Sequence, residues 1–443
     1  MKSKSLLIPM LFGAVFAVPT FAFDEHGRLS FGAFFSHEKH EPEPFSTDNN
    51  DFATSSARFY YRAGDLLTRE WVFTSDLRDK HDFFNKLDRE RQELTDHNSF
   101  QVRQLSLRKN PNSEGLIFEV GRYAIPDAGA TFNDGASIGW RLSQSFSAEA
   151  FAGLNPKQYD KSYLQFREKA TTFGAIASLT PKTPSWTTRK ELHVAHVTQQ
   201  YDGQTDRQYL YQRSAYQWAV GSQVSSMVYL DFVPRTYVQN GLALYDQKWT
   251  SRFFTQLGLS AYDVVEYRRA QDLREQLEPS PYKEASLRGT LLSSPTLRWT
   301  LQTRYGKRSA DDLERLNVTG ECKTPRIHSK NIDMSYRLAQ KKEFTKTGTY
   351  GGYSFGYFTD KDEYEFSIDL GAETETTGQH LHPIIGEATY AFQVSRRFFG
   401  AASLQYQRDE KVEIYSALFQ VTLLFGNQKI SPLRDGTPPR GRL

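Results

Sequence analysis

Apolar and polar residues alternate with a period of two along much of the chain. The clearest case is residues 413–425, near the C-terminal end. Its apolar positions are Tyr415, Ala417, Phe419, Val421, Leu423 and Phe425. Because successive side chains of a β-strand point to opposite sides, this stretch predicts a strand with one continuous apolar and aromatic face. The positions between them, from Ile414 to Leu424, form a mixed second face.

The same alternation recurs many times upstream. Residues 297–305 carry mostly leucine, tryptophan and tyrosine on one face and arginine, threonine and glutamine on the other. Residues 331–338 and 363–371 repeat this division between an apolar and a charged face. Helical periodicity is nearly absent outside a few connecting stretches. The chain is therefore predicted to be all-β, with antiparallel strands that follow one another in up-and-down order.

Short and long connections alternate between these segments. Short ones fall at residues 64–65, 110–115, 143–145, 181–185 and 294–295, and long charged ones at 76–98, 155–169, 266–283 and 307–329. A transmembrane β-barrel has short periplasmic turns and long outer loops, whereas a soluble sandwich would simply hydrate its polar faces. Aromatic residues near strand ends, such as Trp140, Trp299 and Tyr305, fit the interfacial girdles of a barrel. The pattern favours a transmembrane barrel over a soluble sandwich.

The number of strands must be even if both termini lie on the periplasmic side. About 21 segments alternate, so at least one of them is a false split or part of a loop. The segments between residues 207 and 245 are the first candidates for removal. We therefore expect about 18 or 20 strands, with about 16 as the alternative. A barrel of that size is wider than side chains can fill, so water or another object must occupy its lumen.

The N-terminal residues have the layout of a secretory signal peptide. Residues 1–4 are basic, residues 5–18 are mostly apolar, and Thr20, Phe21 and Ala22 form a small-x-small cleavage pattern. The alternative is a membrane anchor, but the apolar run is shorter than the about 20 residues that span a bilayer. We predict a signal peptide at residues 1–22, a barrel at 23–425 and a disordered periplasmic tail at 426–443.

Composition narrows the class of protein. Mean hydropathy is −0.61, yet 14% of residues are aromatic, as a barrel allows because only every second strand residue faces lipid. With 55 basic and 52 acidic residues, the balanced charge gives no reason to expect a nucleic-acid partner. The single cysteine, Cys322, excludes a disulfide framework and a four-thiolate metal site. We expect no cofactor and no metal site.

The terminal strand that ends in Phe425, together with the alternation and the loop asymmetry, resembles Gram-negative outer-membrane β-barrels, the porin-like proteins. The resemblance implies export to the cell outer membrane, where lipid and lipopolysaccharide surround the barrel, and a homo-oligomer is an option. It also implies that the barrel-assembly machinery recognises Tyr415, Phe419 and Phe425. In that family phenylalanine is usually the last residue, whereas Phe425 precedes a tail here.

Charged residues occupy the faces that are predicted to line the lumen. The basic candidates are Arg298, Arg304 and Arg337, and the acidic ones are Asp333, Glu363, Glu365 and Asp369. Segregated basic and acidic walls would create a transverse field that orients and filters polar solutes. Alternatively, these charges only hydrate the lumen and pair with one another.

Three functions fit this reading. The first is a non-enzymatic, porin-like channel for small polar solutes. The second is a structural barrel that sheathes a partner protein, such as a periplasmic electron carrier. The third is an outer-membrane hydrolase, although no spacing of Ser, His and Asp residues singles out a nucleophile and its base.

Overall fold

The computed structural model describes residues 24–40, 50–66, 70–85, 98–111, 113–155, 170–181, 188–233, 236–263, 282–309, 311–327 and 331–426. The predicted signal peptide, and the predicted tail beyond Gly426, lie outside these residues. Among the described residues, no helix is long and apolar enough to cross a membrane.

The chain is built almost entirely of strands. They are β1 (Asp24–His40), β2 (Asn50–Asp65), β3 (Trp71–Asn85), β4 (Asn98–Lys109), β5 (Gly115–Ile125), β6 (Thr131–Arg141), β7 (Phe146–Leu154), β8 (Ala170–Leu179), β9 (Arg189–Tyr201), β10 (Gln204–Ala219), β11 (Ser222–Val233) and β12 (Tyr237–Lys248). The others are β13 (Phe253–Tyr262), β14 (Tyr282–Ser294), β15 (Leu297–Arg308), β16 (Glu314–Ile327), β17 (Ile332–Lys342), β18 (Lys346–Phe358), β19 (Asp362–Glu375), β20 (His380–Leu381), β21 (Ile384–Ser395), β22 (Phe398–Arg408) and β23 (Val412–Gly426). One short 3-10 helix, η1 (Pro126–Ala128), lies between β5 and β6.

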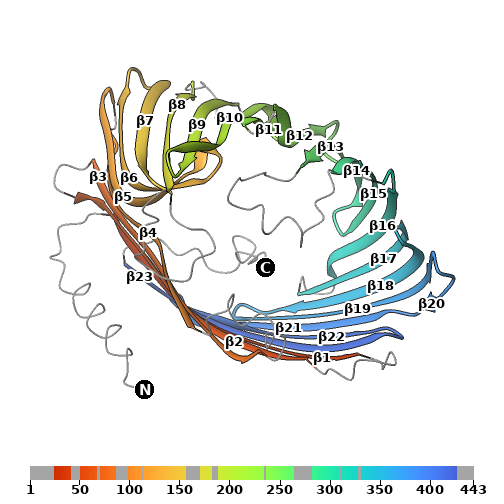
Figure 1. Cartoon of the computed structure of the whole chain (residues 1–443). Coiled ribbons are helices and arrows are strands. Elements are labelled where there is room, and N and C mark those ends of the chain that lie inside the picture. The colour runs from red at the N-terminus through yellow and green to blue at the C-terminus, as the bar shows by residue number, and fades with distance from the viewer. Residues whose placement is uncertain are drawn as a thin grey trace.

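The strands form one closed antiparallel ring. Each long strand pairs with its neighbours in the sequence, and β23 pairs with β1 along its whole length (Figure 1). The two-residue β20 only extends the turn between β19 and β21, so 22 strands make up the wall. The predicted all-β, up-and-down barrel is confirmed, with more strands than the expected 18 or 20.

The additional strands have a clear origin. β16 lies within residues 307–329, which the sequence analysis interpreted as a loop. Its outward-facing residues change from Leu316 and Val318 to Gly320 and Cys322, so the outer face becomes less apolar along the strand. The segments between residues 207 and 245 are all strands, β10 to β12, and none is a false split. β3 likewise extends through Asn85 into the region interpreted as the loop 76–98.

The outer face of the ring is apolar and exposed. Leu338 is 71% exposed and Leu301 is 59% exposed, and similar large side chains stand out from most strands. A continuous apolar surface of this extent on a closed barrel marks contact with lipid. The adjacent strand positions point into the lumen and are mostly polar or charged, as the alternation predicts.

Aromatic side chains gather near both rims of this apolar face. Trp140, Trp299 and Phe425 lie toward the end that carries both termini, and Tyr305 and Tyr415 lie toward the opposite end. At about 3.4 Å per residue and a tilt of about 40°, the segment from Tyr415 to Phe425 rises about 25 Å, the height of an outer-membrane apolar band.

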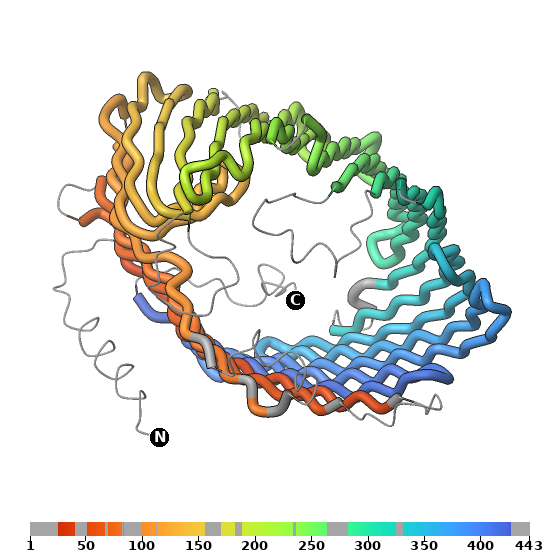
Figure 2. Tube along the Cα trace, viewed as in Figure 1, coloured from red at the N-terminus to blue at the C-terminus, as the bar shows by residue number. Residues whose placement is uncertain are grey.

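The two ends of the barrel differ in their connections. Both termini of the described chain lie at the same end, where β10 meets β11 and β14 meets β15 through tight turns (Figure 2). The connections that join β3 to β4, β7 to β8 and β13 to β14 are the longest, and all three lie at the opposite end. This is the predicted asymmetry between short turns and long loops.

An aromatic cluster covers the seam between the first and last strands. Gly27 of β1 lies between Phe425 of β23 and Tyr61 of β2 in the strand register. A Cβ atom at Gly27 would lie 2.2 Å from the Phe425 ring, so the ring occupies that space. The ring stacks on Phe59 at 5.9 Å and on Tyr61 at 6.2 Å between centroids. The buried Tyr61 hydroxyl donates to Glu25 at 2.9 Å.

Gly27→Ala is expected to destabilise the barrel by about 1–3 kcal/mol, the usual cost of overpacking, because the new methyl group displaces the Phe425 ring. Heat-modifiable migration of the folded protein in detergent gels measures the effect as a lower unfolding temperature. Gly320→Ala is the matched control, because Gly320 is also an outward strand glycine and nothing lies within 4 Å of its Cβ position. Equal unfolding temperatures for both variants and the parent would contradict this role of the seam.

Candidate functional site

The inner surface of the barrel has two parts, a packed wall and a charged hollow. The packed wall consists of buried side chains on the inner faces of β5 and β7 to β11. Its members are Tyr123, Ile125, Phe151, Ile176, Ala195, Val197, Tyr209 and Tyr211, with Ala128 of η1 and the flanking Met227 and Tyr229. Strands β6 to β10 form the most tightly curled part of the ring in Figure 1. Their inner side chains therefore meet one another and fill this side of the lumen.

The helix η1 folds inward and covers the packed wall, where it contacts β8, β9 and β10. The Tyr209 hydroxyl donates to the Ala128 carbonyl at 3.0 Å and contacts the Thr131 hydroxyl. The Tyr229 hydroxyl donates to the Gly129 carbonyl at 2.9 Å. The Ala128 carbonyl also accepts from the Thr131 hydroxyl at 3.1 Å, so side chains satisfy both carbonyl groups of this turn. These bonds hold η1 against the inner wall of the barrel.

The turn after η1 depends on a glycine. Gly129 has a φ of 74°, in the left-handed region that disfavours other residues. A Cβ atom there would lie 2.4 Å from the Tyr229 ring. Backbone conformation and close packing therefore both require glycine at this position.

Charged groups hold the other side of η1. Asp127 accepts a hydrogen bond from Arg213 at 2.9 Å and lies 3.2 Å from His193 Nδ1. Burial alone would raise the pKa of Asp127, but the hydrogen bond with His193 and the charges of His193 and Arg213 outweigh burial and lower that pKa. Asp127 is thus held in its charged form, which favours the docked position of η1.

A buried ion pair contacts the aromatic side chains of the packed wall. Arg207 Nε donates to Asp231 Oδ1 at 2.6 Å, and both side chains are buried. The Arg207 guanidinium also lies 4.2 Å from the centroid of the Tyr209 ring. Breaking such a pair would leave a buried charge uncompensated, so its geometry restricts how the packed wall can move.

The same region brings a serine, a histidine and an aspartate together. Ser178 Oγ lies 2.8 Å from His193 Nδ1, and Asp127 Oδ2 lies 3.2 Å from the same nitrogen. A catalytic relay needs the serine and the carboxylate on opposite ring nitrogens. Rotating the imidazole by 180° would put the carbon Cδ2 at the position of Nδ1, so it would remove both contacts and would not place the two partners on different nitrogens. This cluster therefore stabilises η1 but lacks the geometry of a hydrolase.

The charged hollow lies on the opposite side, along the inner faces of β14 to β21, with a volume of about 500 Å³. It contains five of the seven predicted lumen charges: Arg298, Asp333, Arg337, Glu365 and Asp369. Arg304 lies further along β15, with its guanidinium beside Gln302. Glu363 lies at the start of β19, outside the hollow.

Four further charged residues line the hollow and were not predicted: Arg288, Glu321, Lys323 and Glu387. Glu321 and Lys323 belong to β16, the strand interpreted as a loop. The sequence feature that could have revealed them is their spacing. Glu321 and Lys323 are two residues apart and share one face of the strand, whereas Cys322 lies between them on the weakly apolar face. Arg288 alternates with Leu287 and Leu291 on β14 and could have been found in the same way.

Small residues of β18 form the floor of the hollow. Gly352, Ser354 and Gly356 alternate along its inner face, and the Ser354 hydroxyl lies 2.7 Å from that of Ser335. A Cβ atom at Gly352 would lie 2.0 Å from an Asp369 oxygen. Arg337 of β17 therefore reaches Asp369 of β19 across the glycine and forms an ion pair. The two glycines give room to neighbouring side chains, namely the Asp369 carboxylate at Gly352 and the Phe358 ring at Gly356.

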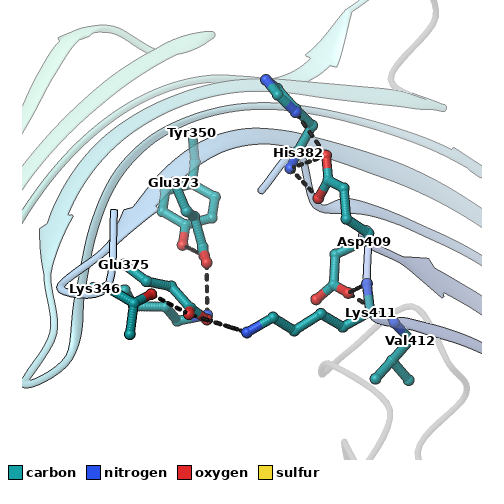
Figure 3. Close-up of polar contacts among 10 residues, drawn as sticks. Lys346, Tyr350, Glu373, Glu375, His382, Asp409, Lys411 and Val412 are labelled. Atoms are coloured by element: carbon teal, nitrogen blue, oxygen red, sulfur yellow. Dashed lines mark hydrogen bonds and ion pairs between the residues drawn. The ribbon is translucent and has the colours of Figure 1, made fainter. Parts of the chain in front are cut away.

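A network of charges fixes the rim above β18 and β19, at the end opposite to the termini (Figure 3). The buried Glu373 carboxylate binds Lys346 Nζ at 2.7 Å and accepts a hydrogen bond from the Tyr350 hydroxyl. Lys411, from the turn between β22 and β23, binds Glu375 at 2.9 Å. Side chains from strands that are not adjacent are thereby tied together.

The turn that carries Lys411 is itself well ordered by hydrogen bonds. Asp409 accepts bonds from the backbone N–H groups of Lys411 at 2.8 Å and Val412 at 2.9 Å. Glu410 accepts bonds from the backbone N–H of His382 at 2.7 and 2.9 Å, and its carboxylate contacts the His382 ring (Figure 3). Burial alone would raise the pKa of Glu410, but the bonds from His382 lower it.

Among the described residues, no group of three or more His, Cys, Asp and Glu side chains could hold a metal ion.

No known protein-family model matches the sequence, and no curated protein matches it. Solved structures with a similar chain path include the outer membrane protein OpdK of Pseudomonas aeruginosa, at 10% identity and a TM-score of 0.46, with 91% of this chain and 99% of that chain covered. OccAB4 of Acinetobacter baumannii is 8% identical, with a TM-score of 0.42, and 92% of this chain and 100% of that chain are covered. These similarities identify no family.

Tyr209→Phe and Tyr229→Phe are each expected to loosen η1. Tyr229→Phe removes one hydrogen bond, and Tyr209→Phe removes the bond to Ala128 together with the contact with Thr131. Each lost bond raises local opening about 2- to 13-fold at about 0.5–1.5 kcal/mol per bond. Amide hydrogen exchange at Gly129 and Thr131 in detergent-solubilised protein measures this opening. Tyr245→Phe is the control, because its hydroxyl contacts only Gln247 among the described residues, on the exposed outer face. Unchanged exchange in both variants would show that the hydroxyls do not hold η1.

Proposed function

We propose that this protein is an outer-membrane channel through which small polar solutes pass. The observation that carries the proposal is the contrast between the two faces of one closed sheet. The outer face is apolar and exposed, and the inner face opens into a hollow lined by nine charged side chains of both signs. Lipid stabilises the first surface and water stabilises the second.

The size of the ring supports an open lumen. Strands spaced about 4.8 Å apart and tilted about 40° enclose, in a barrel of 22, a ring roughly 40 Å across between backbones. The packed wall and η1 fill one side of this space. The charged hollow lies on the other side and offers polar solutes a hydrated path.

Export and assembly belong to the same proposal. The basic and apolar residues of 1–22 support a cleaved signal peptide, and the pairing of β23 with β1 supports a closing strand. Tyr415 and Phe419 lie on the exposed outer face of that strand, and Phe425 lies at its end in the seam cluster. These positions support recognition of all three residues by the assembly machinery and contact with the surrounding lipid or lipopolysaccharide.

A second candidate is a structural barrel that sheathes a partner protein, such as a periplasmic electron carrier. The strand number favours this candidate, because 22-stranded barrels of the outer membrane hold an object in the lumen. The hydrolase alternative is weaker, since Ser178 and Asp127 approach the same nitrogen of His193.

Purified full-length protein in planar bilayers is expected to carry a steady current that is proportional to voltage, without any added partner. Proteoliposomes should swell in small sugars, at rates that fall as the sugar becomes larger, because the lumen is hydrated and open. Heat-denatured protein is the control. A folded barrel that stays electrically closed until a haem protein co-purifies with it would contradict the open channel and favour the sheath.

A further inference from the structure

Eight of the nine charges of the hollow fall into three groups around the wall, and Glu321 is the ninth. Arg288 and Arg298 lie on β14 and β15, at one edge. Glu365 and Glu387 lie on β19 and β21, at the other edge. Within the part of the chain that the structure describes, none of these four forms an ion pair. Unneutralised positive charge therefore faces unneutralised negative charge across the hollow.

Four of the charged groups between these edges neutralise one another in pairs. Lys323 binds Asp333 at 3.4 Å, and Arg337 forms its ion pair with Asp369. Beneath them, the floor carries the Ser354 hydroxyl between Gly352 and Gly356, next to which the Asp369 carboxylate and the Phe358 ring lie. Glu321 of β16 also lies between the edges and forms no ion pair among the described residues, so the centre of the hollow is polar and carries one net negative charge.

Arg298 gives a second, independent indication of a ligand. Its Nε is buried and has no hydrogen-bond partner among the described residues. A buried donor of this kind costs free energy unless something binds it. An anionic group in the hollow would supply the missing acceptor.

We propose that the charged hollow binds short zwitterionic peptides in an extended conformation. The peptide carboxylate would bind Arg288 and Arg298, its amino group would bind Glu365 and Glu387, and its backbone would lie over the glycine and serine floor. This inference rests on the channel function proposed above and names the class of solute for that channel.

The spacing of the strands sets the length of the peptide. From β15 to β19 the wall advances by four strand intervals of about 4.8 Å, or roughly 19 Å along its curve and less across it. An extended chain spans about 3.3–3.6 Å per residue, so a peptide of roughly four to five residues covers most of this distance, whereas a single amino acid does not. The volume of about 500 Å³ falls within the usual range of ligand pockets.

Tetra-alanine tests the proposal on the full-length protein in planar bilayers. We expect it to interrupt the channel current, and we expect N-acetyl-tetra-alanine, tetra-alanine amide and the doubly capped peptide to do so more weakly. Each lost charge should weaken binding about fivefold, the effect of a well-placed, partly exposed ion pair. Di-alanine should bind weakly, because it cannot span the hollow.

Two double variants locate the ends of the peptide. E365Q/E387Q should remove the preference for a free amino group, and R288Q/R298Q should remove the preference for a free carboxylate. Glu114→Gln is the control, since Glu114 lies in the turn before β5, far from the hollow in the fold. Heat-modifiable migration verifies that each variant is folded. The capped peptides test the preference for each free peptide terminus on the unaltered chain.

The outcomes separate this inference from the proposed channel. A conducting barrel that all four peptides, or di-alanine, block equally would overturn the peptide site and leave the channel intact. A non-conducting barrel would overturn the channel. Isothermal titration of tetra-alanine into the detergent-solubilised protein then decides the site: binding that is lost on capping would support it, and no binding would overturn it.

Discussion

A sheet surrounded by lipid must satisfy every backbone N–H and C=O group within itself, because the hydrocarbon offers no hydrogen-bond partner. In this protein the requirement is met by closure, since β23 pairs with β1 from His26 to His40. Aromatic side chains on the outer face cover this seam. Phe425 covers Gly27 and stacks on Phe59 and Tyr61, so side chains of β23 and β2 pack together across the glycine of β1.

Closure also determines what the inner face can do. Where the ring curls tightly, from β6 to β10, inner side chains reach one another and build the packed wall, with η1 fixed upon it by Tyr209 and Tyr229. Along the inner faces of β14 to β21 the side chains instead line a hollow. Its central pairs are Lys323 with Asp333 and Arg337 with Asp369, whereas Glu321 and the charges at both edges form no ion pair among the described residues.

Much of the fold could be predicted from the sequence because a barrel repeats one pattern. The alternation in residues 297–305 and 413–425 identified both faces of β15 and β23. It failed at β16, where Gly320 and Cys322 replace large apolar residues, and with that strand Glu321 and Lys323 of the hollow were missed. Five of the seven predicted lumen charges do meet in one hollow. The packed wall and η1 could not be predicted, because they depend on local curvature that joins residues far apart in the sequence, such as Ala128 and Tyr209.

The central claim is that one face of the sheet meets lipid and the other meets water. Cys322, the only cysteine of the chain, lies on the outer face between Trp299 and Tyr336, and Ser354 lies on the floor of the hollow. In intact membranes, we expect a water-soluble maleimide to leave Cys322 unmodified and to label a Cys322→Ser/Ser354→Cys chain. Labelling of Cys322 but not of the cysteine at position 354 would contradict the account.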